Sequence, residues 1–279
     1  MYSPSFFKSQ AKYGMSVPMD VKLGVIGGTG VADPKLFRQA GEADPRTKYG
    51  RPSDRIRILE LNGTNVAFIP RHGSGHTIPP HMVNSRANIT ALRDMGVERI
   101  IGLAAVGSLR EQLRAGDIVI PDQFIDMTTQ RRLTFYDGPE VVHISAADPF
   151  CPELGQLALQ QARRLGIPVH GKGTYICVEG PRFSTRAESR LWRTMGADII
   201  GMTLVPEAQL ARELGLCYVS VCSVTDYDVW ADRPVSARDV AETMKRNEAN
   251  IQCLLAEMIP KVPEKRGCRC AEALKDAGL

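Results

Sequence analysis

The sequence predicts an α/β protein: a single domain with a central mixed, mostly parallel sheet flanked by helices. Short apolar runs rich in β-branched residues alternate with segments of helical periodicity along most of the 279 residues. No internal repeat, linker or shift of composition interrupts this alternation, which is typical of one α/β domain. Such sheets bind ligands at the carboxyl ends of their strands, so we expect the functional site there.

The composition is that of an ordinary globular protein, with 43 % hydrophobic and 24 % charged residues. The net charge of +4 is small against 35 basic and 31 acidic residues, and no long run of Lys or Arg occurs. We therefore expect neither a nucleic-acid nor a membrane partner. No apolar stretch is long enough to cross a bilayer, and we expect a cytoplasmic protein.

Residues 21–260 form the predicted domain. Residues 1–20 lack the apolar core of a signal peptide, and we expect them to be an N-terminal arm. Residues 261–279 follow the last predicted helix as a C-terminal tail with a Cys-x-Cys motif. The basic residues of this tail are expected to be solvated.

In the first half of the domain, the expected strands are residues 21–26, 55–59, 66–69 and 99–105, and the expected helix is 84–95. The pair Asn62-Gly63 separates the second strand from the third and is a strong signal for a β-hairpin.

In the second half, residues 117–120, 169–178, 199–200 and 217–224 are expected to be extended, and 154–166, 185–195, 206–215 and 236–259 helical. Thr185 and Glu188 have the spacing of a capping box at the start of one helix. Ser236 and Asp239 stand in the same relation at the start of the last helix.

Seven cysteines fall into two groups. Five lie in apolar or periodic contexts and are predicted to be core residues: Cys151, Cys177, Cys217, Cys222 and Cys253. Cys268 and Cys270 lie outside any apolar pattern, in a spacing that differs from a Cys-x-x-Cys zinc motif. Two alternatives stay open for this pair: a disulfide bond that involves one of the two cysteines, or two free thiols without a role.

Asp226 and Asp228 follow the apolar run 217–224 and are the strongest functional signal. In an extended segment, residues two apart point to the same side, so both carboxylates are expected to face one pocket. Two like charges at the end of a buried strand are unfavourable unless a ligand or a reaction uses them.

The loop 27–30 follows the first predicted strand and could bind an anion through backbone N–H groups and the Thr29 hydroxyl. Asp33 replaces the third glycine of a dinucleotide fingerprint, and the Gly-Lys-Thr of a P-loop is missing. A tight turn without a ligand remains the alternative for this loop.

Arg71 and His72 follow another predicted strand, and the planar fork of donors on Arg71 suits an oxyanion. His76 and His81 lie nearby in the sequence, which raises the possibility of zinc. The glycines around them disfavour the helix that would direct two histidines to one ion, so an anion is preferred and no metal is predicted. The small residues Ala104 and Ala105 end a further strand, as expected where backbone approaches a ligand.

Seven stretches of the chain match motifs of a known protein family and occur in the same order as in that family: residues 24–30, 70–73, 107–111, 116–126, 179–188, 201–207 and 225–230. On these stretches the chain resembles the trimeric purine nucleoside phosphorylase family, in the branch that acts on 5′-methylthioadenosine. The resemblance covers nearly all of the chain, from Lys22 to Pro260, and implies a nucleoside phosphorylase-like fold.

The resemblance implies phosphorolysis of 5′-methylthioadenosine to adenine and 5-methylthioribose-1-phosphate, with inorganic phosphate as co-substrate and no cofactor. The residues at the matching positions for phosphate are Thr29, Arg71, His72, Ala104, Ala105 and Thr203. Met202 matches a position against the ribose and Phe183 one against the purine. Many relatives have Thr at the position of Ala104, so one hydroxyl donor to phosphate is missing here.

The base would meet Asp226 and Asp228. The leaving adenine needs a proton at N7, and a carboxyl with a raised pKa can supply it. Asp226, expected to be buried beside a second carboxylate, is the candidate donor, and an ionised Asp228 would accept from the 6-amino group. Relatives that cleave 6-oxopurines have Asn at the position of Asp226 and Glu at that of Ser184, so this chain is expected to prefer a 6-aminopurine.

At the sugar end, relatives that use ordinary nucleosides place a histidine from the start of the last helix at the 5′-hydroxyl. Residues 234–240 have none, and their apolar members, Ala237 among them, suit a methylthio group. His143 matches a position from which a neighbouring subunit closes the pocket, although a packed interface histidine remains the alternative. A trimer or a pair of trimers is therefore expected.

Three other functions stay open at this point. They are a purine nucleoside phosphorylase of broad specificity, a dinucleotide-dependent oxidoreductase built on the glycine loop, and a nucleotide-binding protein without catalysis.

Overall fold

The computed structural model describes residues 21–28, 36–231, 235–275 and 277–278, so the expected N-terminal arm lies outside the described residues. Its described part contains an eleven-stranded sheet in which β2-β3-β4-β1-β5-β10-β9-β7 follow one another, while β11 pairs with β5 and leads through β6 to β8. Parallel and antiparallel pairs both occur, and the central pairs β1–β4, β1–β5 and β5–β11 are parallel. The predicted mixed, mostly parallel sheet is confirmed.

The strands are β1 Leu23–Gly27, β2 Arg38–Ala43, β3 Ile56–Leu61, β4 Thr64–Pro70, β5 Arg99–Ser108, β6 Ile118–Val119, β7 Gln123–Met127, β8 Val169–His170, β9 Thr174–Val178, β10 Ile199–Gly201 and β11 Cys217–Asp226. The α-helices are α1 Ser85–Asp94, α2 Pro152–Arg164, α3 Arg186–Thr194, α4 Leu204–Glu213 and α5 Ala237–Met258. None of the helices in the described ranges is long and apolar enough to cross a membrane.

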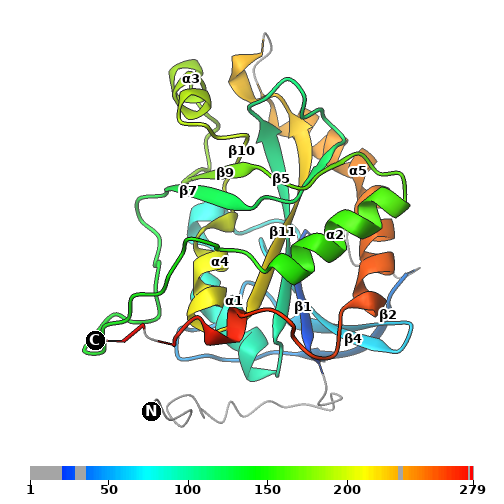
Figure 1. The fold of residues 1–279 in the computed structure, drawn as a ribbon, viewed down its shortest axis with the longest axis vertical. Coiled ribbons are helices and arrows are strands. Elements are labelled where there is room, and N and C mark those ends of the chain that lie inside the picture. The colour runs from blue at the N-terminus through cyan, green and yellow to red at the C-terminus, as the bar shows by residue number, and fades with distance from the viewer. Residues whose placement is uncertain (1–20, 29–35, 232–234, 276, 279) are drawn as a thin grey trace.

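Two helical layers enclose the sheet (Figure 1). Helices α1 and α4 pack together over one face, where Leu92 and Leu210 belong to one buried cluster with sheet residues. Helices α2 and α5 cover the other face, where Leu154 and Leu254 belong to a second cluster. The third helix α3 stands apart at the upper end of the molecule in Figure 1, above a small cluster that contains Trp192.

The local signals read from the sequence are present in the structure. Asn62 and Gly63, both with positive φ (49° and 81°), form the turn of the β3–β4 hairpin, as a type I′ turn requires. Thr185 and Glu188 form a complete capping box at the start of α3. At the start of α5 only one of the two hydrogen bonds of the expected box is found among the described residues: the hydroxyl of Ser236 accepts the backbone N–H of Asp239.

Two expectations about surface and core are corrected. Cys253 is exposed rather than buried, because α5 turns Ile251, Leu254 and Leu255 toward the sheet and leaves Cys253 on its outer side. Cys270, which lies outside any apolar pattern of the sequence, is only 6 % exposed and packs with the core cluster between α2 and α5, whereas Lys261 and Lys265 of the tail are exposed as expected.

Candidate active site

The candidate site lies where β5 loses a neighbour. On one side β5 pairs with β1 as far as Gly102 and with β10 only from Gly107, so residues 103–106 have a strand partner on the β11 side alone. The strands β5 and β11 are parallel and end together at the upper end of Figure 1. A break in strand order at the carboxyl ends of parallel strands is the usual place of a ligand crevice.

Asp226 and Asp228 lie together at this end, but not as two residues of one extended strand. Asp226 is the last residue of β11, whereas Asp228 has a φ of 47° and opens a 3₁₀ turn that ends at Trp230. The backbone N–H of Asp228 donates to Asp226 Oδ1 at 2.8 Å, and the hydroxyl of Thr225 donates to Asp226 Oδ2 at 2.7 Å. Both acidic residues border Gly107 of β5, where a Cβ would lie 2.9 Å from Asp226 Oδ1 and 3.5 Å from Asp228 Cβ.

The two carboxyl groups differ in burial, and the difference runs opposite to the expectation from the sequence. Asp228 is 4 % exposed, and its burial, together with the negative charge of Asp226, raises its pKa above 3.8. The sequence placed the raised pKa on Asp226. Asp226 remains partly exposed, because the turn at Tyr227 directs Asp228 inward instead.

Two serine hydroxyls from the segment before and within α3 face Asp228. Ser184 and Ser189 lie close enough to lower the pKa of Asp228 against the effect of burial. Neither hydroxyl, nor Asp228 Oδ2, has a hydrogen-bond partner among the described residues. Unsatisfied buried polar atoms are rare in native proteins and often mark a place where a ligand supplies the missing partners.

Ser189 was missed by reasoning from the sequence. It is fully buried, one helical turn before Trp192 on the inner face of α3. The available signal was a small polar residue at a core position of an amphipathic helix.

Arg71 is held inside the protein rather than offered to solvent. Its Nε and Nη2 donate to Glu207 Oε1 and Oε2 at 2.6 and 2.9 Å, and Nη1 donates to the Leu103 carbonyl at 2.6 Å. Nη2 also reaches the Ile26 carbonyl at 3.3 Å. The planar fork expected to bind an oxyanion is thus occupied by a carboxylate, and the side chain ties β1, the end of β4 and the middle of β5 to α4.

His72, the next residue, is neutral at physiological pH. Burial and the charge of Arg71 lower the pKa of His72 to about 4. Its Nδ1 lies 2.9 Å from the Ile78 carbonyl, which only accepts hydrogen bonds, so the proton is on Nδ1 and Nε2 carries a lone pair. The ring packs against that of His76, with centroids 4.5 Å apart.

Of the remaining positions expected around phosphate, Ala104, Ala105 and Thr203 lie among the described residues. Ala104 and Ala105 lie in the stretch of β5 whose strand partner is β11 alone, and they are partly exposed, as their proposed role requires. Thr203 immediately precedes α4, and its backbone N–H points to the Tyr175 hydroxyl at 3.4 Å. Thr29 lies outside the described residues.

Positions expected around the nucleoside come from the loops before α3 and α4. The side chain of Met202 closely covers Gly180, where a Cβ would lie only 2.5 Å from Met202 Sδ. Phe183 is 38 % exposed, so much of this large apolar side chain is not covered by other residues of the same chain. Ala237 is the first residue of α5 and is exposed.

His143 lies beside the C-terminal tail rather than beside Asp226 and Asp228. It is exposed, and its backbone N–H donates to the Ala277 carbonyl at 2.7 Å. Its side chain lines a separate cavity of about 940 Å³ together with residues of the tail, Cys268 and Cys270 among them. A role of His143 at a neighbouring subunit stays a prediction.

Sequence comparison relates the chain to known proteins along most of its length. A sequence model described as the phosphorylase superfamily matches residues 22–260. The S-methyl-5′-thioadenosine phosphorylase of Thermofilum pendens is 59 % identical over 257 residues, covering 92 % of this chain and 98 % of that protein. The protein of the same name from Pyrococcus furiosus is 59 % identical over 254 residues, covering 91 % and 98 %.

Solved structures agree with the sequence comparison. A methylthioadenosine phosphorylase from an antarctic soil metagenomic library superposes with a TM-score of 0.90 at 42 % identity, covering 94 % of this chain and 93 % of that one. The Schistosoma mansoni enzyme in complex with adenine gives a TM-score of 0.86 at 38 % identity, covering 92 % and 96 %. A variant of the adenosine/methylthioadenosine phosphorylase from that organism, solved with methylthioadenosine, gives 0.85 at 39 % identity over the same shares.

Proposed function

The chain belongs to the phosphorylase superfamily, and from this membership and the acidic pair beside Gly107 we propose that it catalyses the phosphorolysis of 5′-methylthioadenosine. The products are adenine and 5-methylthioribose-1-phosphate, as in purine and methionine salvage, and the chain acts as a pentosyltransferase. The relatives of this name share more than half of their residues with this chain over nearly their full length. The observation that carries the proposal is the placement of Asp226 and Asp228 beside Gly107, directly after residues 103–106 of β5, which have a strand partner on the β11 side alone.

The reaction separates charge. Breaking the glycosidic bond builds positive charge on the sugar ring and negative charge on the departing base. A phosphate held against C1′ stabilises the first and forms the new bond, and a proton delivered to N7 neutralises the second. A site for this reaction therefore needs an anion cradle and a proton donor on opposite sides of the sugar.

The acidic pair is proposed as the proton donor. The acidic pair can hold a proton, because burial and the negative charge of Asp226 raise the pKa of Asp228. Asp226 is proposed to carry this proton to N7, and Asp228 to accept from the 6-amino group through Oδ2, which has no other partner among the described residues. Ser184 and Ser189 lie close to Asp228 and lower its pKa against the effect of burial.

The anion cradle is proposed to consist of backbone N–H groups of Ala104 and Ala105, the side chains of Thr203 and Thr29, and His72. Neutral His72 can only accept a hydrogen bond at Nε2, so it binds phosphate that carries a proton. Arg71 contributes chiefly by holding the neighbouring segments in place, since Glu207 already neutralises its charge and accepts hydrogen bonds from its guanidinium group. Inorganic phosphate is a co-substrate, and no cofactor is required by this scheme.

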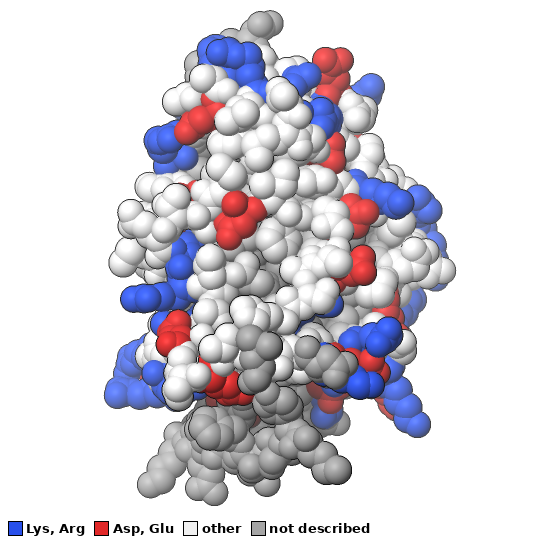
Figure 2. Space-filling model, turned by 60° about the vertical axis from the view of Figure 1, so that its left-hand side comes forward, with Lys and Arg blue, Asp and Glu red and all other residues white. Residues whose placement is uncertain are grey.

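Self-association is proposed to complete the nucleoside pocket. Large apolar side chains are exposed on β7, on the segment that follows it, and around α3: Met127, Leu133, Val141, Phe183, Leu191 and Met195. Figure 2 turns the side of the molecule with β7 and α3 forward and shows broad uncharged areas between the charged side chains. A trimer or a pair of trimers would cover this surface and bring His143 of one subunit toward a neighbouring site, and light scattering would give the subunit number.

A substrate panel tests the proposed reaction. Base release is measured from methylthioadenosine, adenosine and inosine, each with and without phosphate. We expect phosphate-dependent release that is fastest with methylthioadenosine. Inosine as the best substrate would instead indicate a purine nucleoside phosphorylase of broad specificity. If the folded oligomer shows no turnover, a nucleotide-binding protein without catalysis would be the remaining candidate. Saturable NAD(P) binding would favour an oxidoreductase.

A further inference from the structure

Three neighbouring strands lead into segments of the candidate site (Figure 1). Strand β9 lies between β7 and β10, and both pairs are parallel. Because parallel strands have their carboxyl ends at one edge of a sheet, the segments that follow them begin side by side. These segments are residues 128–131 after β7, 179–185 after β9 and 202–206 after β10. The second carries Phe183 and the third carries Met202, the positions expected at the purine and at the ribose.

Arg131, in the first of these segments, reaches both of the others. Its Nε donates to Glu179 Oε1 at 3.1 Å. Its Nη2 donates to the carbonyls of Val178 and Glu179 at 3.2 and 2.7 Å. Its Nη1 donates to the Val205 carbonyl and lies 3.9 Å from Cys177 Sγ. One side chain thus joins the segments that follow three strands.

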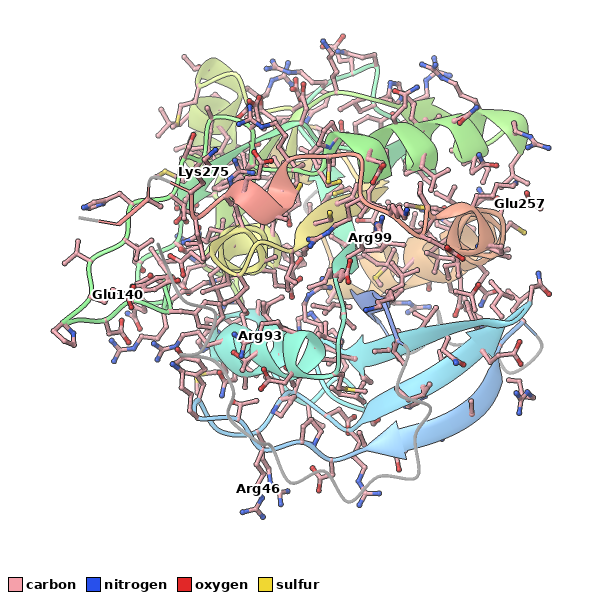
Figure 3. All side chains as sticks on the ribbon, turned by 60° about the horizontal axis from the view of Figure 1, so that its bottom comes forward. Arg46, Arg93, Arg99, Glu140, Glu257 and Lys275 are labelled. Carbon is pink, nitrogen blue, oxygen red and sulfur yellow. The ribbon has the colours of Figure 1, made fainter. Side chains whose placement is uncertain are left out.

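The guanidinium of Arg131 is both buried and fully paired. Figure 3 shows that arginines of this protein occur at the periphery, as Arg46 does, and in the interior, as Arg99 does. Arg131 is of the interior kind, since its side chain is only 5 % exposed. Arg99 leaves Nε and Nη2 without a hydrogen-bond partner in the described part of the chain, whereas every guanidinium nitrogen of Arg131 has an acceptor. Any other orientation of Arg131 would leave buried donors unsatisfied, so its acceptors are held in a fixed arrangement.

Glu179, the charged partner, is itself held from the side of β7. Its Oε2 accepts from the backbone N–H groups of Thr129 and Gln130 and, at 3.1 Å, from the Thr129 hydroxyl. Burial acts to raise the pKa of Glu179, but these hydrogen bonds and Arg131 outweigh it and lower the pKa to about 2. The carboxylate is therefore ionised at neutral pH, and it joins the first two segments by charge-assisted hydrogen bonds.

The ion pair lies beside the contact between the two segments of the nucleoside site. Gly180, the residue after Glu179, is covered by the side chain of Met202, and a Cβ at Gly180 would lie 2.5 Å from Met202 Sδ. The same segment continues to Phe183, three residues further on. A shift of Glu179 would therefore move Phe183 relative to Met202.

The third segment is held at its far end. The Val205 carbonyl accepts from Arg131, and the Val205 N–H points to Cys177 Sγ at 3.4 Å. Thr203, two residues earlier, is the position expected at phosphate. Arg131 therefore holds the end of the segment that carries Met202 and Thr203, as it holds the start of the segment that carries Phe183.

We propose that Arg131, through its ion pair with Glu179 and its bond to the Val205 carbonyl, is a positioning residue that sets the spacing between Phe183 and Met202 in the nucleoside pocket. Its donors are all taken by the protein, so it acts through its neighbours and not on the substrate. This role rests on the proposed function, because Phe183 and Met202 have their expected roles only there.

The alternative is a role in stability alone, and the two roles predict different kinetics. The carboxylate of Asp226 is held by the Thr225 hydroxyl and the Asp228 backbone N–H, without Arg131. Loss of positioning should therefore weaken the binding of the nucleoside more than it slows the chemical step. Loss of stability alone should lower the melting temperature and leave KM of the folded protein unchanged.

The experiment compares the full-length wild-type protein with Arg131→Lys and Glu179→Gln. Lysine keeps the positive charge of Arg131 but replaces its planar fork by a point charge, and glutamine keeps the shape of Glu179 without its charge. Misplacement by ~1 Å can cost about 100-fold, so we expect KM for methylthioadenosine to rise ~10–100-fold in both variants, with a much smaller change in kcat. Calorimetric titration with adenine should show a similar rise in its dissociation constant.

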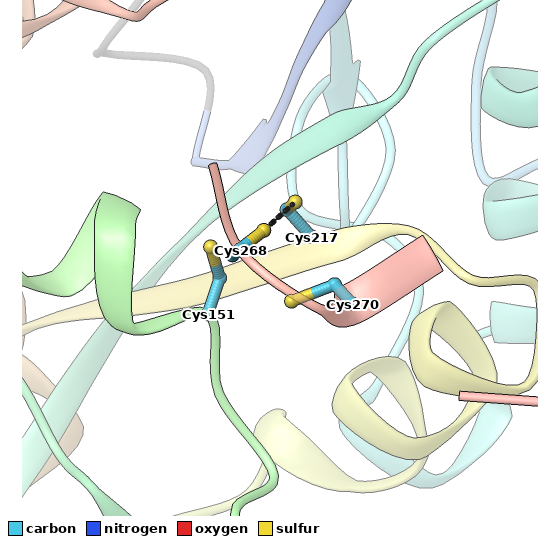
Figure 4. Close-up of side chains that lie close together, drawn as sticks. All are labelled: Cys151, Cys217, Cys268 and Cys270. Atoms are coloured by element: carbon cyan, nitrogen blue, oxygen red, sulfur yellow. Dashed lines mark hydrogen bonds between the residues drawn. The ribbon is translucent and has the colours of Figure 1, made fainter. Parts of the chain in front are cut away.

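Arg266→Lys is the matched control. Arg266 also joins distant segments, since its Nη1 donates to the Gly215 carbonyl at 2.8 Å and its Nε lies 3.4 Å from Glu98 Oε2. Gly215 lies two residues before β11 and Asp226 ends that strand, about 30 Å further along. The tail that Arg266 anchors meets the body of the protein at four cysteines (Figure 4): Cys151, Cys217, Cys268 and Cys270. The control should keep the KM and the adenine affinity of the wild type.

Wild-type values of KM and of the adenine dissociation constant in the folded variants would overturn the role of Arg131, and so would an equal rise in Arg266→Lys. If Arg131→Lys does not fold, Glu179→Gln decides by itself, because it removes the ion pair and leaves every donor of Arg131 an acceptor. An active wild type with unaffected variants contradicts the positioning role alone. A wild type that neither binds adenine nor consumes methylthioadenosine contradicts the proposed function, and the positioning role with it.

Discussion

Arg71 and Glu207 form a buried ion pair with two parallel hydrogen bonds, Nε to Oε1 at 2.6 Å and Nη2 to Oε2 at 2.9 Å. Their side chains are 4 % and 0 % exposed. The Tyr218 hydroxyl donates to the same carboxylate at 2.9 Å, so Glu207 accepts from both residues. The pair links the loop after β4 to α4, and in this way it positions two segments that the proposed phosphate site shares, those of His72 and Thr203.

Glu207→Gln is expected to destabilise the protein strongly. The substitution leaves the buried guanidinium of Arg71 without its counter-charge, which typically costs about 3–5 kcal/mol. Chemical denaturation of the two proteins measures the difference. Glu111→Gln is the matched control, since Glu111 is 80 % exposed and pairs with Arg193 at 3.9 Å on the surface, where such pairs contribute roughly 0–1 kcal/mol. Equal effects of the two substitutions would contradict a buried, dominant ion pair.

Asp226→Asn is expected to change the preferred base. Loss of a general acid lowers rates by roughly 10²–10⁴-fold, and we expect a loss in this range for methylthioadenosine. An amide at this position donates to an oxopurine, so the rate ratio of the 6-oxo to the 6-amino nucleoside should rise. Steady-state kinetics with methylthioadenosine and methylthioinosine give the ratio. An unchanged ratio would argue against contact between Asp226 and the base, and Asp137→Asn, at an exposed residue of the ion pair with Arg86, serves as control.

Asp228→Asn is expected to affect stability in a pH-dependent way. Burial raises the pKa of Asp228 above 3.8 in the folded state, so the folded state favours the protonated carboxyl. The stability that this carboxyl contributes is fully present below pH 3.8 and is lost as the pH rises through the folded-state pKa. The variant, which has no charge to bury, should therefore gain in melting temperature relative to wild type as the pH rises from ~4 to neutral. A constant difference across this range would refute the raised pKa.

His72→Gln is expected to show the opposite dependence on pH. Because the folded-state pKa of His72 is lowered to about 4, the unfolded chain binds more protons than the folded chain between that value and 6.5. Wild-type stability should fall as the pH is lowered through this window, and His72→Gln should lessen the fall. The substitution should also raise KM for phosphate more than KM for methylthioadenosine. His81→Gln, outside the proposed cradle, is the control, and equal changes in both KM values would count against a role at phosphate.

Much of the fold could be predicted from the sequence because its signals are local. The hairpin at Asn62-Gly63 follows from the positive φ that a type I′ turn demands. The start of α3 follows from the Thr185–Glu188 capping box, and the buried strand β11 follows from its apolar run. Each signal is contained within a few neighbouring residues, so no knowledge of distant contacts was needed.

For the candidate site, the sequence could predict which residues belong to it but not their burial or their hydrogen-bond partners. The motifs brought Asp226, Asp228 and Ser184 together by resemblance, and the structure does place Asp228 beside the hydroxyl of Ser184. Which carboxyl is the more buried could not be read from the strand pattern, because the chain leaves the strand at Tyr227. Nor could the pattern show that Glu207, 136 residues away, takes the donors of Arg71.

The sequence by itself determined the phosphorylase family and most of the helices and strands in their order, although it did not predict β2 and β7. It did so because hydrophobic periodicity, turn chemistry and motifs act over short distances along the chain. The tertiary structure alone decided burial and partnership between distant residues: the raised pKa of Asp228, the ion pair of Arg71 with Glu207, and the gathering of Cys151, Cys217, Cys268 and Cys270. These depend on desolvation and on contacts between segments far apart in sequence, which exist only once the chain has folded.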